Sequence, residues 1–194
     1  MPGFFIVIEG IDGAGKTTLS FNLKKELEKR GYSVLITSEP TQGKYGRELI
    51  RKIKNGAITP EEELELFFKD RKEHVEKVLR PALSEGKIVI CDRYFYSTCA
   101  YQGARGLDYR KICRMNGIFP EPDLVILLDL PPEQALGRKE RKERHFERED
   151  FLQRVREIYL EVIKSSDYEI IDASLPREEV LRRALKCLEK YLKG

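Results

Sequence analysis

A glycine-rich stretch at residues 10–18 contains the side chains whose chemistry is easiest to interpret. Its sequence, Gly-Ile-Asp-Gly-Ala-Gly-Lys-Thr-Thr, fits the pattern G-x-x-x-x-G-K-[ST] and follows the apolar run 4–8. Glycines let backbone amides approach an anion closely, while Lys16 offers a positive charge to the β- and γ-phosphates and Thr17 a hydroxyl to Mg²⁺. The sequence therefore predicts a site for a nucleoside triphosphate, formed by Gly10, Ile11, Asp12, Gly13, Ala14, Gly15, Lys16, Thr17 and Thr18.

Two charged residues, Asp92 and Arg93, directly follow another apolar run at residues 88–91. An aspartate at the end of a strand in a phosphate-loop protein helps to hold Mg²⁺, and an arginine there presents a two-pronged donor to a phosphate. The plainer interpretation is a surface ion pair at a strand end. Because the glycine-rich stretch is present, we favour the functional interpretation, with Thr17 and Asp92 as the metal-binding residues.

Phe67 and Arg71 lie four residues apart in a segment expected to be helical, so they share one face of that helix. A phenylalanine can stack on a planar base while an arginine at this spacing donates to the rim of the base. Taken alone, the pair is more typical of a core phenylalanine beneath a solvated arginine. The neighbouring Phe68 is the alternative core residue.

The densest run of charge in the chain, residues 138–144, alternates arginines and lysines with glutamates. Such a run is most simply a solvated helix face with ion pairs between residues four apart. The alternative is a lid that closes over the transferred phosphoryl group, where an arginine stabilises the developing negative charge. The triphosphate site makes the lid plausible without selecting one arginine.

Short apolar runs alternate with amphipathic segments along the whole chain. The expected strands cover residues 4–8, 33–37, 87–91, 124–128 and 168–172. The expected helices cover residues 17–30, 46–54, 60–84, 95–102, 151–165 and 176–192, with a short helix capped by Asp108 and another opened by Pro131. This alternation predicts a single α/β domain, residues 1–194, with a five-stranded parallel sheet, helices on both faces and a lid at about 137–149. Ligands of such sheets gather at the carboxyl ends of the strands.

The composition narrows the class of protein. The net charge of +3 on 194 residues argues against a dedicated nucleic-acid binder. No apolar run reaches the roughly 18 residues that span a membrane, so we expect no membrane partner and a cytoplasmic location. The four cysteines show no C-x-x-C spacing, and we expect four reduced thiols.

Taken together, these motifs resemble those of thymidylate kinases over essentially the full length of the chain. The matching segments are residues 8–18, Phe67 with Arg71, and residues 92–103, 146–147, 151–159 and 171–173. The resemblance implies a P-loop nucleotide kinase fold with a short lid. The glycine-rich loop alone is shared by many activities, whereas the combination of these segments is much more specific.

The resemblance also implies roles at the acceptor base and sugar. Phe67 would stack on thymine, Arg71 would donate to its O4 atom, and Thr98 would face the base edge. Tyr101 would crowd the 2′ position of the sugar and so favour deoxyribose.

Further roles follow at the sugar 3′-hydroxyl and the acceptor phosphate. Asp12 and Glu147 would approach the 3′-hydroxyl, and Arg93 would bind the phosphate. The residues implied to bind dTMP are Asp12, Phe67, Arg71, Arg93, Ser97, Thr98, Tyr101 and Glu147.

Some thymidylate kinases carry their transition-state arginine in the glycine-rich loop, at the position that is Gly13 here, so the arginine is expected from the lid instead. The implied catalytic residues are Lys16, Asp12, Arg93 and the lid candidates Arg138, Arg141 and Arg144. The chain departs from the usual bacterial pattern R-E-P-G-G at residues 38–42, which read S-E-P-T-Q. One phosphate-binding arginine is therefore absent or replaced by Arg47.

These inferences define an expected reaction, the transfer of the γ-phosphoryl group of Mg·ATP to dTMP to give dTDP. ATP and dTMP are the expected partners, Mg²⁺ the cofactor and a homodimer the expected assembly, with the long helix 60–84 and residues 95–102 as candidate contacts. The first alternative is a related P-loop kinase for another nucleotide or a deoxynucleoside. The second is a P-loop ATPase or switch protein, which would need an element to position water.

Overall fold

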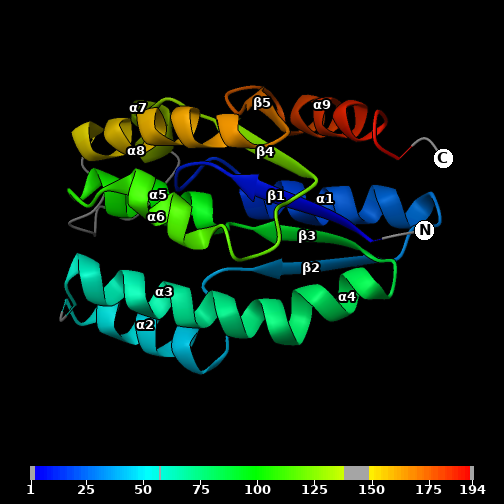
Figure 1. The fold of residues 1–194 in the computed structure, drawn as a ribbon. Helices are drawn as coiled ribbons and strands as arrows, with labels where there is room; N and C mark the ends of the chain where they lie inside the picture. The colour runs from blue at the N-terminus through cyan, green and yellow to red at the C-terminus, as the bar shows by residue number, and fades with distance from the viewer. Residues whose placement is uncertain (1–2, 57, 138–148, 193–194) are drawn as a thin grey trace.

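The computed structural model describes residues 3–56, 58–137 and 149–192. Its centre is a five-stranded parallel sheet with the strand order β2-β3-β1-β4-β5 (Figure 1). The strands are β1 (Phe4–Glu9), β2 (Val34–Ser38), β3 (Ile88–Asp92), β4 (Leu124–Asp129) and β5 (Tyr168–Asp172). The predicted parallel sheet is confirmed, and each predicted strand is found within one residue of its expected ends.

The three middle strands are continuous apolar runs because helices cover both of their faces. Ile6 of β1 lies opposite Ile90 of β3 on one side and Leu124 of β4 on the other, and all three side chains are buried. In the same register, Ile8 lies opposite Asp92. The glycine-rich loop and the Asp-Arg pair therefore leave neighbouring strands at the same edge of the sheet.

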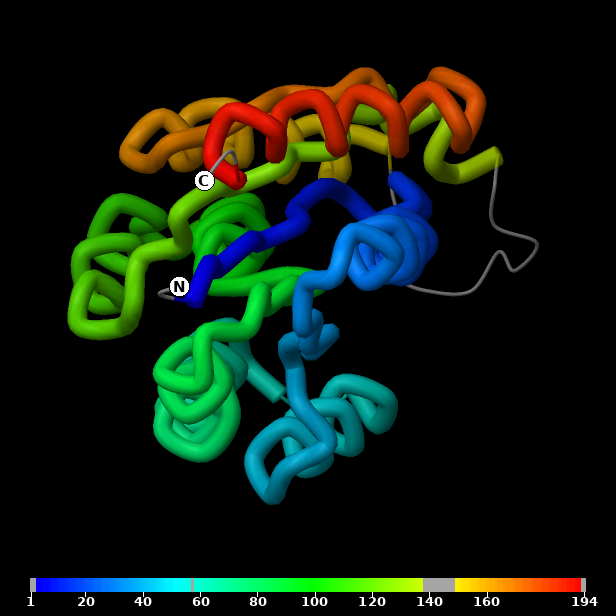
Figure 2. Tube along the Cα trace, turned by 90° about the vertical axis from the view of Figure 1, so that its right-hand side faces the viewer, coloured from blue at the N-terminus to red at the C-terminus, as the bar shows by residue number. Residues whose placement is uncertain are grey.

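Helices form a layer on each side of the sheet, as Figure 2 shows in a view turned by 90° from Figure 1. On one side α1 (Lys16–Lys29) packs against α9 (Arg177–Leu188). On the other side α5 (Phe95–Ala104) lies among α3 (Pro60–His74), α6 (Tyr109–Asn116) and α8 (Glu149–Val162). The remaining helical segments are α2 (Lys44–Lys54), η1 (Val75–Leu79), α4 (Arg80–Ser84), α7 (Pro132–Gly137) and η2 (Ile163–Ser165).

The long helix predicted for residues 60–84 is present but is interrupted. It begins as predicted, because the Thr59 side chain accepts from the Glu62 amide while the Glu62 side chain accepts from the Thr59 amide. The turn η1 is π-helical, and the Arg80 amide donates to the Val75 carbonyl five residues back. Pro81 follows at once and has no amide hydrogen for the ordinary helical bond, so a change of register before it is physically reasonable.

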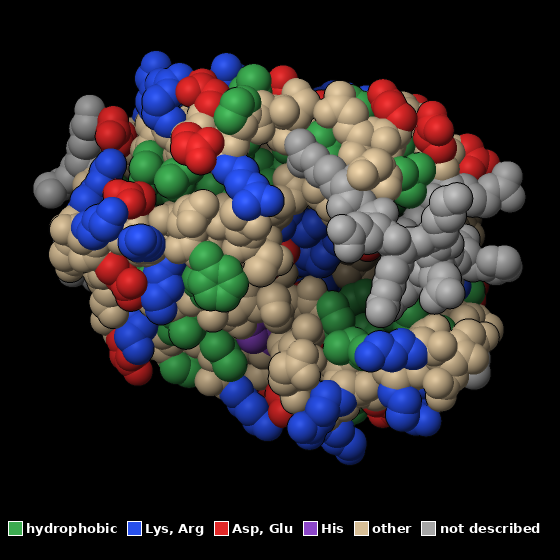
Figure 3. Space-filling model, turned by 180° about the vertical axis from the view of Figure 1, so that it is seen from behind, with side chains coloured by type: hydrophobic (Ala, Val, Ile, Leu, Met, Phe, Trp, Pro, Cys, Tyr) green, Lys and Arg blue, Asp and Glu red, His purple; other side chains and the backbone are tan. Residues whose placement is uncertain are grey.

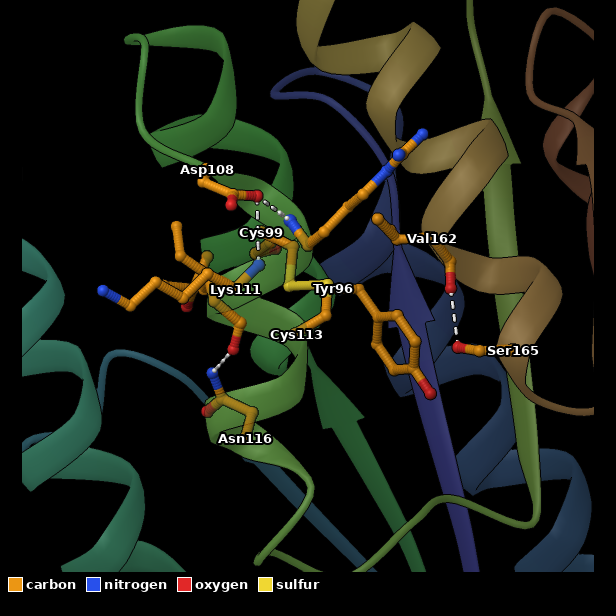
Figure 4. The surroundings of a disulfide bond; sticks show 12 residues. Tyr96, Cys99, Asp108, Lys111, Cys113, Asn116, Val162 and Ser165 are labelled. Carbon is orange, nitrogen blue, oxygen red and sulfur yellow. Dashed lines mark hydrogen bonds between the residues drawn. A yellow bond between two sulfur atoms is a disulfide. The ribbon is translucent and has the colours of Figure 1, made fainter.

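The cysteine prediction is wrong in part. Cys99 of α5 and Cys113 of α6 form a disulfide, with their Cα atoms 5.9 Å apart (Figure 4). The two helices pack side by side, which brings together residues whose separation of 14 in the sequence matches no cysteine motif. Cys91 and Cys187 remain free thiols, and burial raises the pKa of Cys91 well above its usual value.

The structure bears on two further expectations. Helix α5 is almost wholly buried inside the protomer, so residues 95–102 are unsuited to the intersubunit contact that we expected of them. The buried positions include Tyr96, Cys99 and Ala100, each with no exposed surface. Among the described residues, no helix is both long enough and apolar enough to cross a membrane.

Candidate active site

The loop between β1 and α1 adopts the conformation that its glycines permit. Gly13 has φ of 86°, a value that side chains disfavour, and a Cβ atom there would lie 3.0 Å from the Ala135 carbonyl oxygen of α7. Gly15, with φ of 97°, precedes the first residue of α1. A side chain at position 13 would therefore need both a disfavoured backbone conformation and a small shift of α7, which favours glycine there.

The side chain of Lys16 is folded back into the loop. Its Nζ atom donates to the Gly10 carbonyl at 2.9 Å and to the Ile11 carbonyl at 3.0 Å, and the residue is only 6% exposed. Burial, reinforced by the positive charge of Arg93, lowers the pKa of Lys16 to about 7. In this arrangement the ammonium proton is easier to lose than that of an exposed lysine.

Thr17 of α1 and Asp92, the last residue of β3, lie in contact. The Thr17 hydroxyl donates to Asp92 Oδ2 at 2.6 Å, directly beneath the first turn of α1. An alcohol and a carboxylate oxygen are ligands that suit Mg²⁺, which is usually bound through one or two carboxylates together with substrate phosphates. The donor set therefore fits the metal expected with a triphosphate.

Arg93 has a backbone conformation that is rare for a residue with a side chain. Its φ is 72°, which costs about 1–3 kcal/mol in a non-glycine residue, and its amide donates to the Ile8 carbonyl at 3.0 Å. This conformation directs the guanidinium back towards the loop, where it forms an ion pair with Asp12. The Nη1 atom also donates to the Ser97 hydroxyl at 3.0 Å and to the Tyr159 hydroxyl at 3.4 Å.

Glu9, the last residue of β1, is a functional candidate that the sequence analysis missed. Its carboxylate is fully buried and accepts from the Tyr94 amide at 2.7 Å, the Ser97 hydroxyl at 2.6 Å and the Tyr159 hydroxyl at 3.0 Å. Burial raises the pKa of Glu9. The signal was a lone carboxylate between an apolar strand and the glycine-rich loop, a position that buries it.

Arg71 is almost completely buried, with 1% of its surface exposed. Its Nε atom donates to Glu39 Oε2 at 2.9 Å, Nη2 donates to the Thr98 hydroxyl at 3.0 Å, and Nη1 donates to Asn116 Oδ1 at 2.6 Å. The guanidinium also lies over the Tyr94 ring at 5.2 Å. The solvated arginine of the plainer interpretation is therefore not what the structure contains.

The neighbouring phenylalanines of α3 have different surroundings. Phe68 is partly buried and packs against the core, with its ring centroid 5.0 Å from that of Phe119. Phe67 lines a cavity together with Arg71. The structure thus gives Phe68 the core position and leaves Phe67 facing the cavity.

Two cavities meet at the carboxyl edge of the sheet. One, of about 640 Å³, runs from the glycine-rich loop past Thr17 and Asp92 to Val180 of α9. The other, of about 270 Å³, is lined by Phe67, Arg71, Ser97, Tyr101 and Gln102 together with Leu152 and other residues. Asp12 and Arg93 line both cavities. The space-filling view shows a hollow in this part of the surface with basic side chains at its base (Figure 3).

This geometry agrees with comparisons to known proteins. The family model described as "Thymidylate kinase" matches residues 8–184. The chain belongs to the thymidylate kinase family. A "Thymidylate kinase" of Xanthomonas campestris pv. campestris (strain B100) is 44% identical over 185 residues, which are 94% of this chain and 81% of that protein. A "Probable thymidylate kinase" of Archaeoglobus fulgidus is 45% identical over 190 residues, which are 96% of this chain and 95% of that protein.

Several residues implied by the resemblance to thymidylate kinases are brought together at the smaller cavity. Tyr101 accepts from the Asp12 amide at 3.1 Å, and its ring lies 5.2 Å beneath the Arg93 guanidinium. Thr98 is buried behind the cavity against Arg71, rather than in its lining. Arg47 lies exposed on α2, away from both cavities.

The lid candidates cannot be placed in the same way. Arg138, Arg141, Arg144 and Glu147 fall outside the described residues. Their roles remain predictions from the resemblance to thymidylate kinases.

The structure adds a candidate at the acceptor cavity that the sequence analysis did not single out. The Gln102 side chain donates from Nε2 to Glu63 at 2.7 Å, and Glu63 also pairs with Arg105. The buried Oε1 atom of Gln102 has no hydrogen-bond partner within the described part of the chain. Adjacent residues of a helix do not share a face, so its place directly after Tyr101 was no signal, and the cavity lining identifies it.

The donor side also includes residues that the sequence analysis left out. Ala173, Leu175, Arg177 and Val180 line the larger cavity beyond the glycine-rich loop. They follow β5 at the carboxyl edge of the sheet, where a nucleoside extending from the loop would lie.

Proposed function

We propose that the protein transfers the γ-phosphoryl group of Mg·ATP to the 5′-phosphate of dTMP. The bond between the γ-phosphorus and the β–γ bridging oxygen breaks, and a bond forms to an oxygen of the acceptor phosphate, which gives ADP and dTDP. The observation that carries this proposal is the meeting of two cavities at Asp12 and Arg93. A donor in one cavity and an acceptor in the other would have their phosphates side by side at these residues.

The larger cavity is assigned to ATP. Loop amides and the N-terminus of α1 would hold the phosphates, and Lys16 would leave its carbonyl partners to contact the β- and γ-phosphates. Thr17 and Asp92 would hold Mg²⁺, which neutralises phosphate charge when it is bound. The apolar side chains of Leu175 and Val180 would cover the nucleoside end.

The smaller cavity is assigned to dTMP. Arg93 would bind the acceptor phosphate, and Phe67 would stack on thymine while Arg71 and Gln102 meet the polar edge of the base. Tyr101 would lie against the sugar at the 2′ position. Ser97 would act through Arg93, since its hydroxyl accepts from the guanidinium.

Positioning and charge neutralisation supply the catalysis in this proposal. The acceptor phosphate is already an anion, so little proton abstraction is needed before it attacks. Asp12 would orient the sugar and hold Arg93 until the acceptor arrives. One of Arg138, Arg141 and Arg144 would complete the charge stabilisation, and Glu147 would approach the sugar from the same segment.

Two features of the proposal concern the whole molecule. We propose a homodimer, for which the exposed surface of α3 remains the candidate contact. We also propose a cytoplasmic enzyme that acts on small nucleotides, without a nucleic-acid or membrane partner.

The test is ATP consumption measured against dTMP, dUMP, UMP, CMP, AMP and thymidine. A clear preference for dTMP is expected, and a clear preference for another acceptor would reject the assigned substrate. That second result would support the related nucleotide or nucleoside kinase. ATP hydrolysis that is independent of every acceptor would support an ATPase or switch protein.

A variant of the loop lysine tests the mechanism separately. Lys16→Ala should abolish phosphoryl transfer while the circular dichroism spectrum stays unchanged. Substantial remaining activity would contradict the role of Lys16.

A further inference from the structure

Each nitrogen of the Arg71 guanidinium donates to a buried acceptor, which shows which N–H group is left for a ligand. Glu39 accepts from Nε at 2.9 Å and forms an ion pair with Nη2 at 2.7 Å, and Thr98 accepts from Nη2 at 3.0 Å. Asn116 accepts from Nη1 at 2.6 Å. Nη1 carries two N–H groups, and because Asn116 takes one of them, the other remains for a ligand in the cavity.

Asn116 itself does not line either cavity among the residues described, yet its side chain is oriented for this contact. It is 1% exposed, and its Nδ2 atom donates to the Ile112 carbonyl at 2.8 Å. Figure 4 shows this bond one helical turn from Cys113. Because the amide nitrogen is committed to the helix backbone, the oxygen is the atom that faces Arg71.

The helix that carries Asn116 is fastened next to the helix that carries Thr98. Cys113 precedes Asn116 by three residues, Cys99 directly follows Thr98, and the two cysteines are joined. The disulfide therefore ties together the two helices that hold the Nη1 and Nη2 ends of the Arg71 guanidinium.

The contact at Nη1 is the one that sets the direction of the remaining N–H group. Glu39 fixes the edge formed by Nε and Nη2, and rotation of the plane about that edge would move Nη1 most. The Asn116 oxygen opposes such a rotation. A buried charged donor that loses its acceptor is also costly, which favours a shifted guanidinium when the oxygen is removed.

We propose that Asn116 is a positioning residue for recognition of the acceptor base, acting through Nη1 of Arg71. The inference rests on the proposed function because it places the base beside Arg71. It assigns to α6, which lies outside the cavity, a part in acceptor selection.

The test compares Asn116→Leu, which removes the acceptor oxygen at similar volume, with Asn116→Asp, which retains one. The Leu variant should raise KM for dTMP at least about tenfold and leave KM for ATP within about twofold, because a hydrogen bond to a charged group is lost. The Asp variant should restore KM for dTMP to within about threefold of the original. If KM for both substrates rises together, or if Asp fails to restore it, the proposal is wrong.

A control and a smaller variant separate positioning from folding. Ile112→Val perturbs the same helix at a buried apolar position and should lower the melting temperature without changing KM for dTMP. If Asn116→Leu does not fold, Asn116→Ser replaces it, with the same expected change in KM. A rise in KM with Ile112→Val equal to that with the Asn116 variant would assign the effect to helix packing.

Two measurements confine the effect to the base and to Arg71. Inhibition by 2-deoxyribose 5-phosphate, which lacks a base, should be unchanged in Asn116→Leu. In an Arg71→Met background, Asn116→Leu should weaken calorimetric dTMP binding by less than about twofold, whereas a full additive loss would overturn the proposal. The ATP-consumption assay with different acceptors tests the proposed function on the unmodified enzyme, whereas the Asn116 variants test only the positioning role. Failure of the proposed function can therefore be distinguished from failure of the Asn116 proposal.

Discussion

Binding of ATP should be coupled to proton uptake by Lys16. The pKa of this residue is about 7 in the ligand-free protein, against an ordinary value of 10.5, so much of it is neutral at pH 8. Phosphates beside Nζ favour the charged form and raise the pKa again. Binding should therefore take up roughly half a proton to one proton per ATP at pH 8, and the affinity for Mg·ATP should fall several-fold from pH 7 to pH 8.

Titration calorimetry in buffers of different ionisation enthalpy measures this uptake directly. The charged groups facing Lys16 are Asp12, Asp92, Glu9 and Arg93, and Lys16→Arg keeps their surroundings while its guanidinium remains charged. Uptake should vanish in that variant. Uptake below about 0.2 protons at pH 8 in the unmodified protein would show that Lys16 is charged before binding, and would refute the reasoning.

The lowered pKa of Lys16 also determines how the free energy of unfolding changes with pH. Because the folded pKa of Lys16 lies below its unfolded value, the unfolded chain binds more protons between about pH 7 and 10.5, so this residue makes stability rise with pH across that range. The direction is opposite to the fall in ATP affinity, which separates the two effects experimentally.

Three further outcomes are expected. Tyr101→Ala should relax the preference for dTMP over ribo-TMP in competition assays. Tyr101→Phe should keep the preference and lose only about 1 kcal/mol of binding free energy with its hydroxyl. An unchanged preference in the alanine variant would contradict the role of Tyr101 at the 2′ position. Gly13→Ala should destabilise by about 1–3 kcal/mol and by more than Gly31→Ala in urea unfolding, because both have positive φ but only Gly13 has a backbone carbonyl at 3.0 Å. Cys113→Ser should lower the free energy of unfolding by about 3 kcal/mol, and reduction of the unmodified protein should have the same effect. Cys187→Ser should leave it unchanged, because Cys187 is a free thiol. Equal losses in the two serine variants would argue against the disulfide.

The fold was predictable because its signals are local. The runs 88–91 and 124–128 are continuously apolar, as expected when both faces of a sheet are covered, and the capping box at Thr59 marks a helix start without tertiary information. The π-helical turn at Val75–Leu79 was not predicted, although Pro81 shortly after it is a local signal that the regular hydrogen bonding of the helix is interrupted.

The candidate site was predictable only where residue type and position agreed. Arg93 was identifiable because it directly follows a strand. Its contact with Asp12 could be expected because the carboxyl ends of parallel strands meet at one edge of the sheet. The contact between Arg71 and Asn116 spans 45 residues, and that between Glu9 and Tyr159 spans 150. Neither residue spacing nor helical periodicity encodes such pairs, so only the packing of α5, α6 and α8 reveals them.

The buried carboxylate of Glu9 has a consequence for how the enzyme is made. Its partners lie 85, 88 and 150 residues further along the chain, on β3–α5 and on α8. These are contacts of high contact order, which form only after long loops have closed. As the chain leaves the ribosome, Glu9 lacks its last hydroxyl donor until Tyr159 of α8 has emerged, so β1 carries an incompletely satisfied carboxylate for most of synthesis. Arg93 shares the Ser97 and Tyr159 hydroxyls with Glu9, so this arginine is fixed in place only after α8 has packed against β1 and α5.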